Sequence, residues 1–222
     1  MPPKPMSLFF SGIFLVLSIM VATLAKQEST PALQAKNWDS ANILNQNTSA
    51  GPHGLSTLSD YAVLDACQRI AKSANVLLAP SAIRLQVLQT CQNLSTEIAN
   101  SSRQNAYALA ALAYFAGAQA QTDVMNQALK DSYAAAPNAQ WIAQQRVAVA
   151  EAHFSVLHAA TKTGHLGDLA LLVQSESGVH ALAQRYINKR DFRARMTRVI
   201  EPLPADTQQR FLRRLDIEMR HP

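Results

Sequence analysis

Four ionisable side chains in the middle of the chain are the first candidates for chemistry, because histidine and carboxylate are common zinc ligands. Two ligands on one helix need to lie three or four residues apart to project from the same face. His153 and His158 are five residues apart, which separates them by about 140° around a helix. We therefore expect no metal and no cofactor, and we interpret the histidines as solvated or helix-end residues. These four residues are Glu151, His153, His158 and His165.

Nucleophilic and acid–base catalysis have no clear carrier in this sequence. It contains no GxSxG motif, no glycine-rich phosphate loop, and no serine or cysteine in a known arrangement with histidine. A lone catalytic glutamate, as in glycan lyases, is the alternative, but we interpret Glu97, Glu151 and Glu176 as surface charges. The prediction is a protein that is not an enzyme and has no catalytic residues.

The two cysteines, Cys67 and Cys91, have a spacing that favours a disulfide. Apolar residues recur at three- and four-residue steps over 58–74 and 81–98, which predicts two amphipathic helices. Each cysteine is twelve residues from Ala79, which with Pro80 separates the two segments. In an antiparallel hairpin the two sulfur atoms would face each other. The alternative is two buried, unpaired cysteines. Because a CxxC motif is absent, we expect the bond to be structural.

Basic side chains are concentrated near the carboxyl end. Residues 184–222 contain ten of the 20 lysines and arginines but five of the 15 acidic residues, which accounts for the net charge of +5. One interpretation is a solvated face with i, i+4 pairs such as Asp206–Arg210 and Arg214–Glu218. The other is a binding face for an acidic protein, anionic lipid headgroups or an anionic glycan, and not for nucleic acid. This possible face comprises Arg193, Arg195, Arg198, Arg210, Arg213 and Arg214.

The elements that would position these residues are all helical. Glycine accounts for only 7 of 222 residues, good helix formers dominate, and no segment alternates as a strand should. We therefore predict an all-α fold. Within it, the helix over 140–160 should bury Trp141, Val147, Ala150, Phe154 and Leu157, and Asp206 should cap the last helix. The expected helices after the cysteine pair are 102–119, 122–136, 140–160, 166–174, 178–188, 191–200 and 206–219.

The amino-terminal segment Met6–Ala25 contains twenty residues without a charge. A helix of that length spans a hydrocarbon core of about 30 Å, and Lys4 before it favours a cytoplasmic amino terminus. Small residues over 23–25 would also permit cleavage as a signal peptide, although the apolar run exceeds the usual signal core. We predict a transmembrane anchor over 1–26, a flexible tether over 27–56 and an extracytoplasmic helical domain over 57–222.

One expected hairpin resembles a tetratricopeptide repeat. The resemblance is carried by ALAYFAG over 111–117, by Ala128-Leu129, and by the closing AAPN over 135–138. Tyr114 lies 23 residues before Pro137, two or three more than in the usual pattern, and no second copy is clear at a 34-residue period. The resemblance implies antiparallel helical hairpins in an irregular stack.

Scattered motifs over residues 105–215 carry a second resemblance. They are APNAQWIA over 136–143, Arg146, Asp168-Leu169, Arg185-Tyr186, Phe192-Arg193 and Arg210-Phe211-Leu212. In these motifs the chain resembles the small membrane-anchored helical proteins of bacterial exopolysaccharide biosynthesis loci. The resemblance implies an accessory role beside polymerase or export components, and it supplies no catalytic residue.

These patterns predict a single-pass protein of the bacterial inner membrane with its carboxyl-terminal domain in the periplasm. The leading hypothesis is a non-catalytic scaffold for envelope polysaccharide biosynthesis or export, which binds a protein partner in a groove between hairpins. The alternatives are a periplasmic glycan-active enzyme with a helical solenoid and an adaptor for another envelope complex. The enzyme hypothesis expects a deep cleft that holds an acidic side chain.

Overall fold

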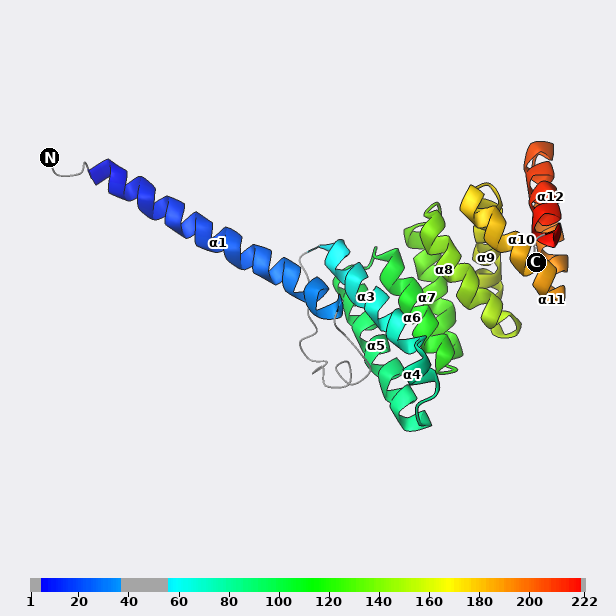
Figure 1. Cartoon of the computed structure of the whole chain (residues 1–222), viewed down its shortest axis with the longest axis horizontal. Helices are drawn as coiled ribbons and strands as arrows, with labels where there is room; N and C mark the ends of the chain where they lie inside the picture. Colours follow the sequence, from blue (N-terminus) through cyan, green and yellow to red (C-terminus); the bar gives the residue numbers. More distant parts are fainter. Residues whose placement is uncertain (1–4, 37–55, 221–222) are drawn as a thin grey trace. The chain divides into compact units, whose positions relative to one another are not determined.

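The computed structural model describes residues 5–36 and 56–220, and its secondary structure is helical, with no strand in those ranges (Figure 1). The predicted all-α fold class is therefore confirmed. Contacts divide the chain into unit 1, Met1–Leu94, and unit 2, Ser95–Pro222, and this boundary lies within the helix over Ser81–Ser101. The helices are α1 (Pro5–Lys36), α3 (Thr57–Ala71), α4 (Ala74–Leu77), α5 (Ser81–Ser101), α6 (Ala106–Ala118), α7 (Thr122–Ala135), α8 (Gln140–Ala152), α9 (Ala159–Val173), α10 (Glu176–Asn188), α11 (Arg190–Ile200) and α12 (Ala205–Arg220).

Helix α1 contains a stretch that is long and apolar enough to span a membrane. The side chains from Ile13 to Leu24 are exposed along this stretch rather than packed in a core. Two hydroxyl groups in it are satisfied by the helix itself, because Ser18 donates to the carbonyl of Phe14 and Thr23 donates to that of Met20. The hydrocarbon core of a bilayer contains no water, so the polar groups of a spanning helix must form hydrogen bonds within the protein.

The predicted flexible tether over 27–56 is wrong for residues 27–36, because α1 continues to Lys36. Contacts with α3 explain the extra helical turns. The Glu28 carboxylate accepts from the Ser56 amide at 3.0 Å, and the Arg69 guanidinium donates to the Ala35 carbonyl at 3.1 Å. Ala35 itself is buried. The remainder of the predicted tether, 37–55, lies outside the described residues.

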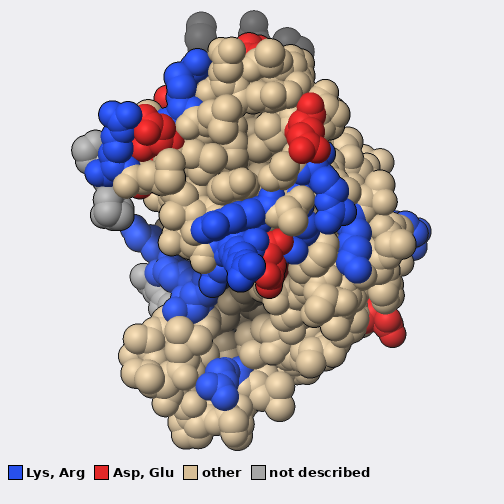
Figure 2. All heavy atoms as spheres, turned by 90° about the vertical axis from the view of Figure 1, so that its right-hand side faces the viewer, with Lys and Arg blue, Asp and Glu red and all other residues tan. Residues whose placement is uncertain are grey.

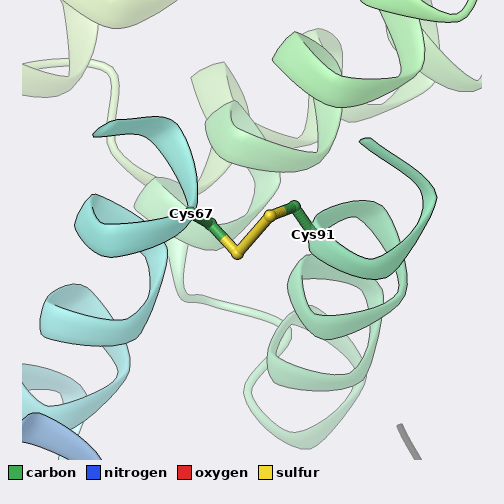
Figure 3. The surroundings of a disulfide bond; sticks show 2 residues. All are labelled: Cys67 and Cys91. Atoms are coloured by element: carbon green, nitrogen blue, oxygen red, sulfur yellow. A yellow bond between two sulfur atoms is a disulfide. The ribbon is translucent and has the colours of Figure 1, made fainter. Parts of the chain in front are cut away.

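Unit 1 contains the predicted cysteine hairpin, with Cys67 on α3 and Cys91 on α5 (Figure 3). The two residues are joined as a disulfide, their Cα atoms are 5.6 Å apart, and both side chains are fully buried. Leu64, Val87 and Leu94 contribute to the surrounding core. The two cysteines therefore meet, as the expected register about Ala79-Pro80 requires.

Unit 2 begins with two helical hairpins, α6–α7 and α8–α9, which lie side by side (Figure 1). Helix α6 contacts α8, and α7 contacts α9, so the second hairpin repeats the placement of the first. Helix α8 begins at Gln140, 34 residues after α6 begins at Ala106. Helix α10 then contacts α9, α11 and α12.

Small residues allow the helices of the first hairpin to approach closely. Ala113, Ala116 and Ala128 are buried at their contact, and Met125 fills the space between them. A Cβ atom added at Gly117 would lie 2.9 Å from the imidazole of His153, so only glycine fits there without a shift. The abundance of alanine therefore acts through close helix packing.

The predicted helix over 140–160 is wrong, because α8 ends at Ala152 and α9 begins at Ala159 after a 3-10 turn over Phe154–Val156. The buried side chain of Asn126 on α7 stabilises this break. Its amide donates to the Val156 carbonyl at 3.1 Å, and its oxygen accepts from the His158 backbone at 2.7 Å. Asn126 thereby caps the amino terminus of α9 from another helix.

Two smaller expectations also need correction. Trp141 is 47% exposed instead of buried, with its ring against Tyr107 at a centroid distance of 4.9 Å, and Phe154 is only half-buried. Asp206 does not cap α12, because the helix begins one residue earlier and the Pro204 carbonyl accepts from the amides of Thr207 and Gln208. Asp206 lies in the first turn, where its charge favours the positive end of the helix dipole.

Candidate functional site

The four-residue group considered for metal binding is separated in the structure, but it contains one close pair. His165 Nε2 and Glu151 Oε1 are 2.6 Å apart, and both side chains are at most 2% exposed. His153 lies against Gly117, and His158 is exposed, 3.5 Å from Asp123. No group of three or more His, Cys, Asp or Glu in the described ranges could hold a metal ion. The interpretation of Glu151 and His165 as surface residues is wrong.

Glu151 is also bound by Arg195, which reaches it from α11. Arg195 donates from Nη2 to Oε2 at 2.6 Å and from Nε to Oε1 at 3.2 Å. Its guanidinium lies 3.9 Å from the centre of the Phe154 ring. Burial raises the pKa of Glu151, but hydrogen bonds and charges from His165 and Arg195 outweigh it and hold the pKa below the ordinary 4.5. Glu151 is therefore an ionised hydrogen-bond acceptor.

A second buried ion pair joins α8 to α9. Arg146 donates to Asp168 at 2.8 Å and 2.6 Å, and both side chains are 2% exposed. The remaining guanidinium donors reach the carbonyls of Ser132 and Ala136 at the end of α7, at 3.2 and 3.3 Å. Burial raises the pKa of Asp168 more than the contacts with Arg146 lower it. This pair connects three helices.

The predicted arginine face has several internal partners. Arg193 donates to the carbonyls of Tyr186 and Ile187 at 2.9 and 2.8 Å, which caps the end of α10. Arg210 caps α9 in the same way through the Gln174 carbonyl at 3.0 Å. These two arginines bind the carbonyl groups at the ends of neighbouring helices. This structural role explains their presence without a ligand.

The other arginines of that face divide into paired and exposed residues. The predicted Arg214–Glu218 pair is confirmed at 2.5 Å, and Arg198 donates to the Ala194 carbonyl of its own helix. Figure 2 shows that basic side chains still gather on the side of the protein that carries α10–α12. Arg213, on α12, borders a shallow depression there with Glu176.

An open groove of about 980 Å³ lies along the first hairpin of unit 2. Its walls come from the end of α5 and from α6 and α7. Leu109, Leu112 and the 42% exposed Val124 supply apolar surface. Asp123 and Asp131 add two negative charges, and Arg103 adds one positive charge. The groove can accept an apolar side chain flanked by basic groups.

Sequence reasoning missed the buried pairs because their members are far apart in the chain. Arg146 and Asp168 are 22 residues apart, and Glu151 and Arg195 are 44 apart. Taken singly, each of these residues carries a charged side chain, which is typical of a surface position. The motifs at Arg146 and Asp168 were singled out by resemblance, and the structure assigns them to one ion pair.

Comparison with known proteins gives no relative: no family model, no curated protein and no solved structure is significantly similar to this chain. The functional argument therefore depends on the residues of the chain itself.

Proposed function

We propose that this chain is a membrane-anchored, non-catalytic scaffold whose helical domain binds a protein partner outside the cytoplasm. The observation that carries the proposal is the open groove over α5–α7, with apolar walls and the carboxylates of Asp123 and Asp131. Exposed apolar surface in a concave site is typical of protein-binding surfaces. The occupant is an amphipathic partner segment whose basic residues complement the two carboxylates.

The apolar helix α1 supports anchoring in a membrane. A compartment outside the cytoplasm is supported by the disulfide between Cys67 and Cys91, because such bonds persist in oxidising environments. We assign the domain to the periplasm of a bacterium, and we place the partner in the envelope polysaccharide biosynthesis or export machinery, as the sequence motifs suggest.

The state of Glu151 supports a non-catalytic role over the glycan-active enzyme. A general acid must hold a proton near the working pH. Glu151 borders a depression, but its lowered pKa and its bonds to His165 and Arg195 keep it ionised and occupied. The hairpin contacts of α6–α9, repeated after 34 residues, favour a tetratricopeptide-like stack with a binding groove.

Site-specific photo-crosslinking in the cell tests this function. A benzoylphenylalanine at Val124 lies in the groove, and one at the exposed Gln209 on α12 is the matched control. We expect Val124 to crosslink to a polysaccharide polymerase or export component, and Gln209 not to do so. The same product from both positions, or from neither, would contradict the proposal. Alkaline phosphatase fused after Pro222 should be active, since it requires export.

A further inference from the structure

A second depression, of about 710 Å³, lies where α10 ends and α11 begins. We call it the junction basin and define it by Ser155, Arg185, Asn188, Lys189, Arg190 and Asp191. It belongs entirely to unit 2 and is separate from the groove over α5–α7. Three of these residues are cations, Arg185, Lys189 and Arg190, which we call the outer cations. None of them belongs to the predicted arginine face.

Those three cations differ from the arginines that cap helices. The side chains of Lys189 and Arg190 are exposed and form no hydrogen bond or ion pair within the described ranges. Arg185 is half-buried, with its guanidinium 5.9 Å from the centre of the Phe192 ring and no carboxylate partner in those ranges. Arg195 also borders the basin, but it is bonded to Glu151, whose charge it offsets. Asp191 opposes the outer cations with one negative charge. The basin therefore keeps an excess of positive charge directed at solvent.

The amino terminus of α11 adds to that charge. Lys189 is the N-cap residue of α11. Its side chain accepts no hydrogen bond from the amides of the first turn. The positive end of the helix dipole favours an anion at this position. Three cationic side chains and a helix terminus therefore act on the same space.

The lining of the basin favours a polar ligand over a protein side chain. Eight of its twelve lining residues are charged or polar, and the other four are Ala148, Ala152, Phe154 and Phe192. Exposed Ser155 and Asn188 offer neutral hydrogen-bonding groups. Protein-binding hot spots usually bury an aromatic or aliphatic anchor in an apolar pocket. The groove over α5–α7 has that character, and the junction basin does not.

We propose that the junction basin binds the carboxylate groups of an acidic polysaccharide. Arginine and lysine form charge-assisted hydrogen bonds with carboxylates, and arginine can do so with two donors. Asn188 and Ser155 lie where hydroxyl groups of adjoining sugars can be bonded. This inference rests on the proposed function, since it adds the polymer itself to the protein partner of the scaffold.

Binding of tetragalacturonate to the full chain in detergent micelles tests the inference by calorimetry. Arg185→Ala/Lys189→Ala/Arg190→Ala should weaken binding at least about tenfold, and added salt should weaken binding to the unaltered chain because exposed charges are screened. The matched control, Arg198→Ala/Arg213→Ala/Arg220→Ala, removes the same charge outside the basin and should change affinity less than about twofold. Circular dichroism should show both variants folded.

Neutral galactotetraose and tetraglutamate distinguish binding of an acidic sugar from binding of any sugar or of any carboxylate-rich chain. We expect no binding of the neutral sugar and weaker binding of the peptide. Equal losses in both triple variants would indicate bulk charge and overturn the inference, as would peptide binding as tight as that of tetragalacturonate. Vesicles with anionic lipid that compete through the basin cations would assign it to headgroups instead. Failure here leaves the crosslinking result at Val124 intact, so the two proposals can be rejected separately.

Discussion

Units 1 and 2 join their helices in different ways. In unit 1 the buried disulfide between Cys67 and Cys91 links α3 to α5. In unit 2 guanidinium–carboxylate pairs with buried carboxylates, Arg146–Asp168 and Arg195–Glu151, link α8 to α9 and to α11. A disulfide acts mainly by restricting the unfolded chain, whereas a buried ion pair is stable only while both partners and their hydrogen bonds are present. The stability of unit 1 should therefore depend on redox conditions, and the stability of unit 2 should depend on the charges of the paired residues.

The largest effect should follow from breaking one partner of the Arg146–Asp168 pair. Arg146→Ala leaves the Asp168 carboxylate buried without its cation, and we expect a loss of about 4 kcal/mol in the free energy of unfolding. Hydrogen exchange of the α8 and α9 amides in the full chain measures it. The double variant Arg146→Met/Asp168→Leu removes both charges and should lose less. A double variant less stable than the single one would show that the pair itself stabilises unit 2.

Removing the disulfide should have an intermediate effect confined to unit 1. The cysteines are 24 residues apart in sequence, and closing a loop of that length is worth about 3 kcal/mol. Cys67→Ser/Cys91→Ser should lower protection of the α3 amides and leave those of α9 unchanged. Dithiothreitol should have the same effect on the unaltered chain and none on the variant. Loss of protection in both units would refute the contrast between them.

The smallest effect concerns acid stability. Because the pKa of Glu151 is lowered below 4.5 on folding, the unfolded chain binds more protons in that range. The contribution of Glu151 is therefore present above pH 4.5 and is lost as the pH falls through its folded-state pKa. Glu151→Gln should be less stable at neutral pH and should flatten the acid side of the stability profile. Glu176→Gln, at an exposed glutamate, is the control and should keep the slope of the unaltered chain.

Several elements were predictable from sequence because their signals are local. The three- and four-residue apolar spacing and Pro80 specify α3 and α5, and these in turn specify the cysteine register. The uncharged run over 6–25 indicates an apolar helix. Helix α7 ends at the predicted position, within one residue, because Pro137 follows.

The break between α8 and α9 could not be predicted in the same way. No proline or glycine marks residues 152–159, and the local pattern favours a continuous helix. Asn126, on another helix, supplies the hydrogen bonds that end one helix and begin the next. The roles of Glu151 and the cations around it were missed for the same reason. Arg195 binds it, and Lys189 and Arg190 remain exposed.

Sequence alone therefore determines where most helices form, that one apolar helix precedes them, and that the two cysteines meet, because these depend on neighbours within a few turns. Tertiary structure decides which charges are buried, which arginines cap helices, and where α8 stops. Those outcomes depend on partners that other helices supply, 22 and 44 residues away for the two carboxylate pairs, and their hydrogen bonds exist only once the helices have packed.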